Sequence, residues 1–230
     1  MPSLADEIVS TTRRLVALQL WQLGAIKVNL DEPFRLVSGN YSPIYINCRL
    51  LISFPAFADL FAAATRLIVE HRQVKFDVVA GGETAGIPFA AFVARAFGLP
   101  MMYVRKELKG HGLPSRVEGS LQPQARVILV EDLITDAGSK ISFVQGIRNA
   151  GGVVGDVLVV FDRLQGGRDA LEQEGVRLHA MTDMEMALSE AEVAGLLSRE
   201  ELDSVRSYLV DPKAWHSVRG LPYRSELRGG

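Results

Sequence analysis

Two adjacent acidic residues, Glu131 and Asp132, follow directly after a short apolar run at 126–130. A turn of small and polar residues comes next and leads into a predicted helix at 139–149. Backbone N–H groups at a helix start, together with hydroxyl groups, can hold a phosphate dianion. A pair of carboxylates can accept hydrogen bonds from the two ring hydroxyls of a ribose. The spacing therefore predicts a site for a phosphorylated sugar, with negative charge beside a sugar carbon that becomes cationic as its leaving group departs.

The whole segment from 131 to 139 carries this prediction. The residues predicted to contact the phosphorylated sugar are Glu131, Asp132, Leu133, Ile134, Thr135, Asp136, Ala137, Gly138 and Ser139. A simpler interpretation is that two acids close a strand and that Thr135 or Asp136 caps the next helix. Capping does not explain the paired acids, because two like charges repel unless a cation or a hydroxyl group lies between them. The segment also lacks the Gly-Lys-Ser/Thr and Gly-x-Gly-x-x-Gly patterns of common nucleotide-binding loops.

A second candidate segment lies between 105 and 112. Within seven positions it contains four groups that can carry positive charge: Arg105, Lys106, Lys109 and His111. Glycines among them disfavour regular packing, and an isolated charge run is usually a solvated surface loop. This run directly follows a predicted strand, so we expect it to cover an anionic ligand, neutralise a polyphosphate leaving group and exclude water.

Short apolar runs alternate with helical patterns through the middle of the chain. The predicted strands are 76–80, 101–104, 126–130 and 153–161, and the predicted helices are 55–72, 87–97 and 139–149. This alternation is typical of an α/β fold in which a parallel-sheet core is flanked by helices. Ligands bind such sheets beyond the carboxyl ends of the strands. The loops after Ala80, Val130 and Phe161 are therefore the candidate sites.

The two ends of the chain add elements to this core. The patterns predict a helix at 5–24, a hairpin at 34–47, helical structure over 183–209 and an irregular tail over the last twenty residues. We expect a single domain, 1–230, in three parts. These parts are an N-terminal helix and hairpin hood (1–54), an α/β core (55–182), and C-terminal helices with a tail (183–230).

The composition disfavours several classes of protein. Of 230 residues, 48% are hydrophobic and 23% are charged, and the net charge of −2 disfavours a nucleic-acid partner. The single cysteine, Cys48, is expected to pack as a small apolar side chain and fits a reducing, cytoplasmic location. The first twelve residues lack a signal-peptide pattern, and no apolar run approaches the roughly 18 residues of a membrane span, so no membrane contact is expected. No metal-ligand spacing connects His71, His179 and His216.

The segment 126–139 resembles the phosphoribosyl pyrophosphate signature of type I phosphoribosyltransferases: an apolar strand, two acids and two apolar residues before a Thr/Gly-rich phosphate loop. The pattern Arg-Lys-x-x-Lys-x-His-Gly over 105–112 resembles the catalytic loop of orotate phosphoribosyltransferases. Segments 34–45 and 81–88 and the pair Asp162-Arg163 resemble the N-terminal hairpin, the pyrophosphate-side loop and the strand-end pair of that family. The resemblance runs from about residue 14 to the tail, and the matching segments follow one another in the same order as in that family.

The resemblance implies transfer of the phosphoribosyl group of 5-phosphoribosyl 1-pyrophosphate (PRPP) to orotate. The products would be orotidine 5′-monophosphate and pyrophosphate, as part of pyrimidine biosynthesis. It also implies a homodimer in which Lys106, Lys109 and His111 reach the partner's active site, while Arg105 serves its own subunit. Mg²⁺ is expected to arrive with the pyrophosphate rather than to sit in a protein cage.

The resemblance further implies roles for single residues. Lys109 and Asp132 are expected to be catalytic, and Thr135 and Arg163 are expected to contact orotate. A guanidinium group suits an anionic, planar pyrimidine carboxylate. A plain surface pair between Arg163 and Asp162 is the alternative for that arginine.

Two other functions stay open at this point. One is the same chemistry on another base. The other is a non-catalytic regulator that senses PRPP, although the retained Lys106, Lys109 and His111 speak against it. Some relatives carry lysines at the positions of Val37 and Ala85, where those lysines contact orotate and pyrophosphate, so this chain departs from their pattern at both places.

Overall fold

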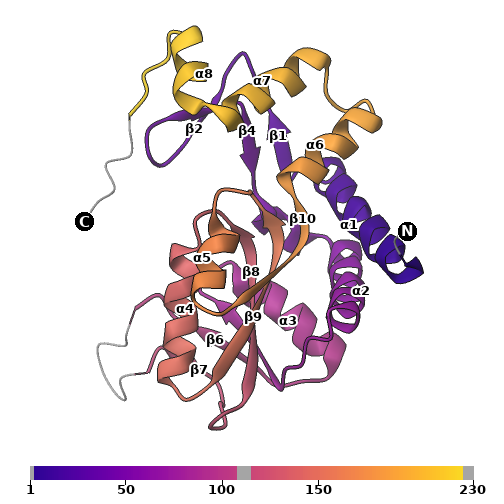
Figure 1. Cartoon of the computed structure of the whole chain (residues 1–230), viewed down its shortest axis with the longest axis vertical. Helices are drawn as coiled ribbons and strands as arrows, with labels where there is room; N and C mark the ends of the chain where they lie inside the picture. The colour runs from indigo at the N-terminus through magenta and orange to yellow at the C-terminus, as the bar shows by residue number, and fades with distance from the viewer. Residues whose placement is uncertain (1–2, 108–114, 225–230) are drawn as a thin grey trace.

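A computed structural model describes residues 3–107 and 115–224 and has a six-stranded sheet at its centre (Figure 1). The strands, in spatial order, are β10 (Arg177–Asp183), β9 (Val153–Asp162), β8 (Arg126–Ile134), β5 (Val78–Gly82), β6 (Met101–Val104) and β7 (Val117–Glu118). All neighbours pair in parallel except β6 and β7, which are antiparallel. The predicted α/β fold with a parallel-sheet core is confirmed, with one short antiparallel edge strand that was not predicted.

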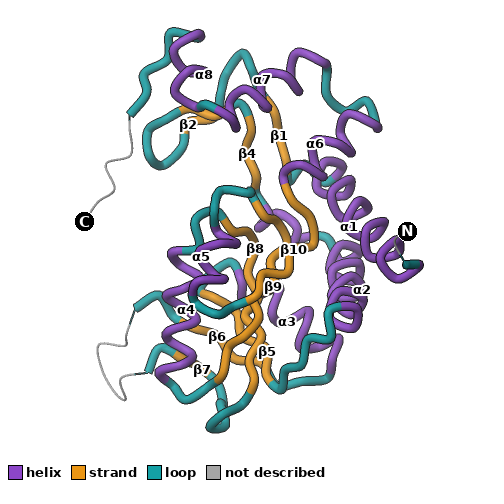
Figure 2. Tube along the Cα trace, viewed as in Figure 1, coloured by secondary structure: helices purple, strands orange, loops and turns teal. Residues whose placement is uncertain are grey.

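Helices cover both faces of this sheet. Figure 2 shows two helices on one side, α2 (Pro55–His71) and α3 (Gly86–Phe97), and two on the other, α4 (Gly138–Asn149) and α5 (Gly167–Gln173). Successive side chains of a strand point to opposite faces, so in β8 Ile128 and Val130 pack into one core cluster while Val127 and Leu129 pack into the other. A strand buried on both faces is apolar throughout. No helix of the described ranges is long and apolar enough to span a membrane.

The N-terminal elements are α1 (Leu4–Gln22), β1 (Ile26–Val28), β2 (Phe34–Arg35), β3 (Tyr41–Ser42), β4 (Ile44–Ile46) and the 3₁₀-helix η1 (Cys48–Ser53). The hairpin predicted at 34–47 is right for β2 and β3, which pair antiparallel. It is wrong for β4, which pairs with β1 instead. The reason is burial, since Ile44 and Ile46 both turn into the core and β1 covers that edge.

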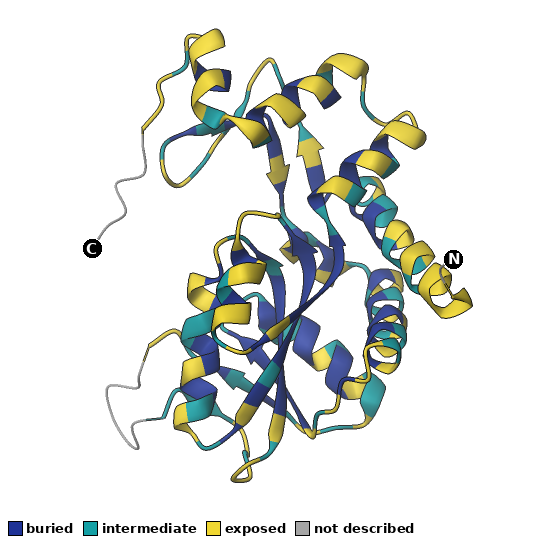
Figure 3. Cartoon of the chain, viewed as in Figure 1, coloured by how far each residue is buried: buried dark blue, intermediate teal, exposed yellow. Residues whose placement is uncertain are grey.

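The C-terminal elements are α6 (Met184–Val193), α7 (Arg199–Val210) and α8 (Pro212–Val218). The prediction of an irregular tail is wrong over α8, where Trp215 and His216 are buried. Figure 3 shows that most of the buried residues gather in the central sheet. The backbone N–H of Tyr41 donates to Nε2 of His216 at 3.0 Å. The C-terminal helices are therefore tied to the N-terminal hairpin.

Strand β8 is longer than its apolar run. The strand was predicted to end at 130, but Glu131 and Asp132 both lie inside β8, which continues to Ile134 and pairs with β9 over this stretch. The turn is confined to 135–137. The two acids are therefore held by the sheet's hydrogen-bond ladder rather than by a loop.

Strands β5 and β8 are neighbours, and the chain leaves them in opposite directions. After β5 it passes to β6 on one side, and after β8 it passes to β9 on the other. At such a switch point the two connections diverge and open a crevice outside the carboxyl ends of the strands. The topology thus places a crevice beside Gly82 and Glu131.

Candidate active site

A cleft of about 340 Å³ opens at this switch point. It is lined by the loop after β5, the carboxyl end of β8, the first half of α4, the segment from β4 into η1, and Lys106 after β6. Of the residues predicted to bind the phosphorylated sugar, it brings together Glu131, Asp132, Leu133, Ser139 and Lys106. We call it the switch-point cleft.

Glu131 is only 4% exposed and faces a lysine that is itself buried. The Nζ atom of Lys140 lies 3.1 Å from Oε2 of Glu131. Within the described chain, Oε1 has no hydrogen-bond partner and is enclosed by Gly82 and Gly86. Burial raises the pKa of Glu131 to about 7, and the nearby charge of Asp132 adds to this while Lys140 opposes it. Glu131 can therefore change its protonation state near neutral pH.

Gly86 leaves the space that the Glu131 carboxyl group occupies. A Cβ added there would lie 2.2 Å from Oε1 of Glu131 and 2.4 Å from the carbonyl oxygen of Val130, which is backbone and cannot rotate away. We expect Gly86→Ala to lower the free energy of unfolding by about 1–3 kcal/mol, the usual cost of overpacking. Urea unfolding measures it. Gly155→Ala is the matched control, because a Cβ there meets nothing within 4 Å, and equal stability of the two variants would contradict this packing.

The raised pKa of Glu131 predicts a pH dependence of stability. Between about pH 4.5 and 7 the folded state holds a proton that the unfolded state has released, so the free energy of unfolding should fall as the pH rises through this window. One such group can lower the free energy of unfolding across this window by at most about 3 kcal/mol. Glu131→Gln keeps the shape of the protonated acid, so urea unfolding at pH 5 and 7.5 should show a smaller fall for this variant than for the parent chain. An equal fall in the free energy of unfolding for the variant and the parent chain would mean that Glu131 titrates at its ordinary pKa.

Asp132 is buried beside Glu131 and has different partners. Its Oδ1 accepts a hydrogen bond from the N–H of Leu133 at 2.8 Å, and its Oδ2 lies 3.7 Å from Nε of Arg49. Arg49 comes from η1 on one side of the sheet, and Lys140 comes from α4 on the other. Each acid thus has its own cation, which offsets the repulsion between the two carboxylates.

The turn after β8 leads directly into the start of α4. Ala137 has a left-handed backbone, with φ 70°, and no side-chain oxygen to cap the helix. Asp136 accepts from the N–H of Gly138 at 3.1 Å, but it precedes the N-cap, and α4 has no side-chain N-cap hydrogen bond. The hydroxyl of Ser139 accepts from Nζ of Lys140 at 3.3 Å. Ile134 belongs to the core, and the residues from Thr135 to Gly138 lie outside the lining of the switch-point cleft.

The basic segment is described only at its start. Lys106 lines the cleft, and its N–H donates to Oε2 of Glu83 at 2.9 Å. Arg105 is instead turned toward Glu118, with 3.6 Å between Nη1 and Oε1. Lys109 and His111 lie outside the described residues.

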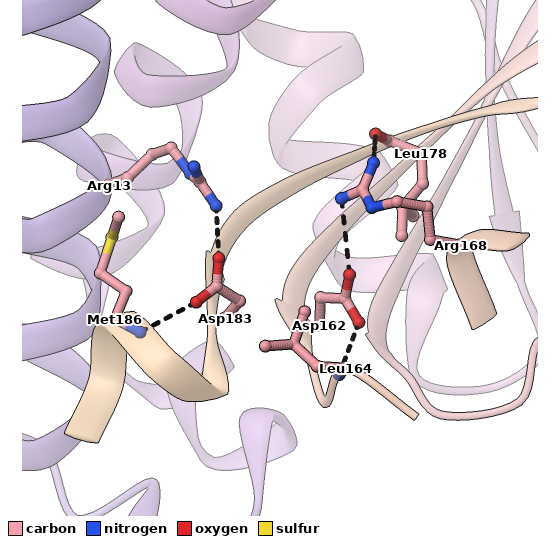
Figure 4. Close-up of polar contacts among 7 residues, drawn as sticks. All are labelled: Arg13, Asp162, Leu164, Arg168, Leu178, Asp183 and Met186. Carbon is pink, nitrogen blue, oxygen red and sulfur yellow. Dashed lines mark hydrogen bonds and ion pairs between the residues drawn. The ribbon is translucent and has the colours of Figure 1, made fainter. Parts of the chain in front are cut away.

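The surface pair proposed as the alternative for Arg163 does not form. Asp162 is buried and pairs with Arg168, at 3.5 Å between Oδ2 and Nη2 (Figure 4). Arg163 is not among the lining residues of the cleft, and its Nε is buried without a partner in the described chain. Its positive charge lowers the pKa of the Cys48 thiol, which burial raises far more strongly. Cys48 is therefore a protonated, packed side chain, as predicted, with Arg163 nearby.

The described residues contain no group of three or more histidine, cysteine, aspartate or glutamate side chains placed to hold a metal ion. A carboxylate in the cleft, that of Asp132, could contact an ion that is held mainly by another molecule.

Comparison with known proteins places this chain in a family. A model described as "Phosphoribosyl transferase domain" matches residues 53–174. The orotate phosphoribosyltransferase of Ruegeria sp. (strain TM1040) is 46% identical over 218 residues, which cover 93% of this chain and 95% of that protein. The chain belongs to the orotate phosphoribosyltransferase family. The predicted family and enzyme class are thereby confirmed.

Solved members of the orotate phosphoribosyltransferase family share the fold. The enzyme of Aeropyrum pernix is 32% identical with a TM-score of 0.66, over 80% of this chain and 99% of that one. The Mycobacterium tuberculosis enzyme, solved in complex with PRPP, is 26% identical with a TM-score of 0.62, over 76% of this chain and 98% of that one.

Two positively charged residues of the site were not identified from the sequence. Lys140 is one position beyond the predicted phosphate segment, and Arg49 lies in η1, which no pattern indicated. The available signal for Lys140 was its place in the first turn of α4, close to both acids. Ala85, where some relatives have lysine, lines the cleft, whereas Val37 is fully exposed.

Proposed function

We propose that this chain transfers the phosphoribosyl group of PRPP to orotate and releases orotidine 5′-monophosphate and pyrophosphate, as a step of pyrimidine biosynthesis. The observation that carries the proposal is the meeting of Glu131, Asp132 and Ser139 in one cleft at the switch point of the sheet. Membership of the orotate phosphoribosyltransferase family supports it, and a relative of the same fold was solved with PRPP bound.

We assign the ribose to the acid pair. Each carboxylate would accept a hydrogen bond from one ring hydroxyl, and together they would place negative charge beside the anomeric carbon. The bond from that carbon to the pyrophosphate breaks as the base attacks, and positive charge develops on the sugar. Stabilising this charge with groups fixed before the reaction is an effective route to catalysis.

We assign the 5′-phosphate to the segment from 135 to 139, where N–H groups at the start of α4 favour an anion. Thr135 and Arg163 would contact orotate. Arg105, Lys106, Lys109 and His111 would neutralise the departing pyrophosphate.

Three further statements belong to this proposal. Mg²⁺ would be held mainly by PRPP with Asp132 as a protein contact, which fits an ion that keeps its waters and prefers phosphate oxygens. When bound, it would offset charge on the leaving pyrophosphate. The chain would act in the cytoplasm as a homodimer, with the basic segment shared across the subunits.

We further propose that residues 1–230 act as one domain. The hood (1–54) and the C-terminal part (183–230) would be appendages of the core (55–182) and would pack on its outside. The bond between Tyr41 and His216 supports a joint role for these two parts.

An assay with a panel of bases tests the reaction. Protein, Mg²⁺ and PRPP are mixed with orotate, uracil or a purine, and the ultraviolet absorbance of each base is followed. Consumption of orotate alone is the expected result. Consumption of another base with orotate inert would make this a phosphoribosyltransferase of different specificity. PRPP binding with no turnover of any base would make it a sensor.

A further inference from the structure

A second pocket, of about 260 Å³, lies along the outer edge of β10. It is enclosed by α1, the end of α2, and α5, and it shares no lining residue with the switch-point cleft. Four arginines line it: Arg13, Arg72, Arg168 and Arg177. His179 lines it as well, and Glu172 is its single acidic lining residue. We call it the arginine pocket.

Two of the arginines are held by carboxylates that lie outside the pocket lining (Figure 4). Arg13 pairs with Asp183, at 2.7 Å between Nη2 and Oδ2. Arg168 pairs with Asp162 and also donates through Nη1 to the carbonyl oxygen of Leu178 at 3.1 Å. These bonds fix the two guanidinium groups in place before any ligand arrives.

A third arginine is fixed in a similar way. Arg177 lies 2.9 Å from Asp156, and the same carboxylate accepts from Nε2 of His179 at 2.7 Å. Burial raises the pKa of Asp156, but these two partners together lower it below its ordinary value and so keep that carboxylate charged. Arg177 and His179 line the pocket and Asp156 does not, so the guanidinium group rather than the carboxylate faces the space within.

The arginine pocket keeps donors that the protein itself does not use. A guanidinium group has five N–H donors, and the Nε of Arg13 is buried with no partner in the described chain. Arg72 is exposed, and among the described residues its side chain has no ion pair, although its charge helps to lower the pKa of Asp6. Protection of the sheet edge explains Arg168, which covers a free carbonyl of β10. It does not explain the orphaned donor of Arg13 or the convergence of Arg72 and Arg177 on one space.

We propose that the arginine pocket binds a phosphate group, either free phosphate or the phosphate ester of a small metabolite, at a site separate from the active site. Planar guanidinium forks match the oxygens of phosphate in pairs. The volume is sufficient for a phosphate with a small sugar attached, and the one acidic lining residue leaves an excess of donors.

Imidazole resonances provide a local readout on the full chain. The protein has four histidines, so the signal of His179 can be assigned and followed by NMR during titration with inorganic phosphate, ribose 5-phosphate or sodium chloride at matched ionic strength. We expect a saturable shift of His179 with both phosphates and not with chloride. Tighter binding of ribose 5-phosphate would identify a metabolite ester, and equal affinity would identify free phosphate.

Substitutions of the pocket arginines test whether the shift of the His179 signal comes from binding in the arginine pocket. Arg72→Gln is expected to weaken phosphate binding about tenfold to a hundredfold, the loss expected for one charged hydrogen bond. Adding Arg177→Gln should weaken it further. Arg199→Gln on α7, a highly exposed arginine far along the chain, is the matched control and should change nothing. Unchanged affinity in Arg72→Gln and in the double variant, or an equal response to chloride, would overturn the proposal.

Discussion

Replacing Asp132 with asparagine is expected to lower kcat/KM for PRPP by about a hundredfold to a thousandfold, the usual loss when one preorganised charge-stabilising group is removed. The substitution is nearly isosteric, and an amide oxygen can still accept from the N–H of Leu133, as Oδ1 of Asp132 does. The melting temperature should therefore stay close to that of the parent chain. Steady-state kinetics and a thermal melt measure the two quantities.

Asp203→Asn is the control for this prediction. Asp203 is exposed on α7 and, among the residues that the structure describes, pairs only with its helix neighbour Arg199, so its loss should affect neither activity nor melting. Full activity of Asp132→Asn would mean that the acid pair is structural, with its charges serving only to hold Arg49 and Lys140 in place.

Replacing Lys109 with alanine is expected to have the second large effect. Lys109 is proposed to contact the pyrophosphate as it leaves, so kcat should fall about a hundredfold to a thousandfold while the dissociation constant for PRPP changes little. Single-turnover kinetics and equilibrium binding separate the two. Lys75→Ala, at an exposed position before β5, is the control. Unchanged turnover would remove Lys109 from the mechanism.

A mixing experiment tests whether Lys109 acts across the subunits. If the basic segment serves the partner, a mixed dimer of Lys109→Ala and Asp132→Asn contains one intact site. Random exchange of the two inactive variants should then restore about one quarter of the parent activity. If Lys109 serves its own subunit, each site of the mixed dimer lacks one of the two groups, and no activity returns.

The core of the fold could be predicted because its signal is local. The stretch 127–130 is buried on both faces, which makes it apolar at every position, and the predicted helix at 55–72 agrees closely with α2. The pairing of β1 with β4 was missed because two three-residue strands carry almost no pattern. The short helix α8 did carry a signal, since Asp211 and Pro212 form the cap and first turn that favour a helix start.

The acids of the site were predicted from the sequence, and their cations were missed. Glu131 and Asp132 stand out because they interrupt an apolar strand. Lys140 and Arg49 look like ordinary surface residues until the fold brings α4 and η1 to either side of β8. The raised pKa of Glu131 has the same origin, because the enclosure of its carboxyl group by Gly82 and Gly86 depends on tertiary packing.

A crystal structure of this chain with PRPP and Mg²⁺ bound would test the role of the acid pair most directly. We expect the two ribose hydroxyls to lie within hydrogen-bonding distance, about 3.2 Å or less, of the carboxylates of Glu131 and Asp132. The 5′-phosphate should lie against the N–H groups at the start of α4. A ribose bound elsewhere, with both acids still contacting only Lys140, Arg49 and the backbone, would contradict the account.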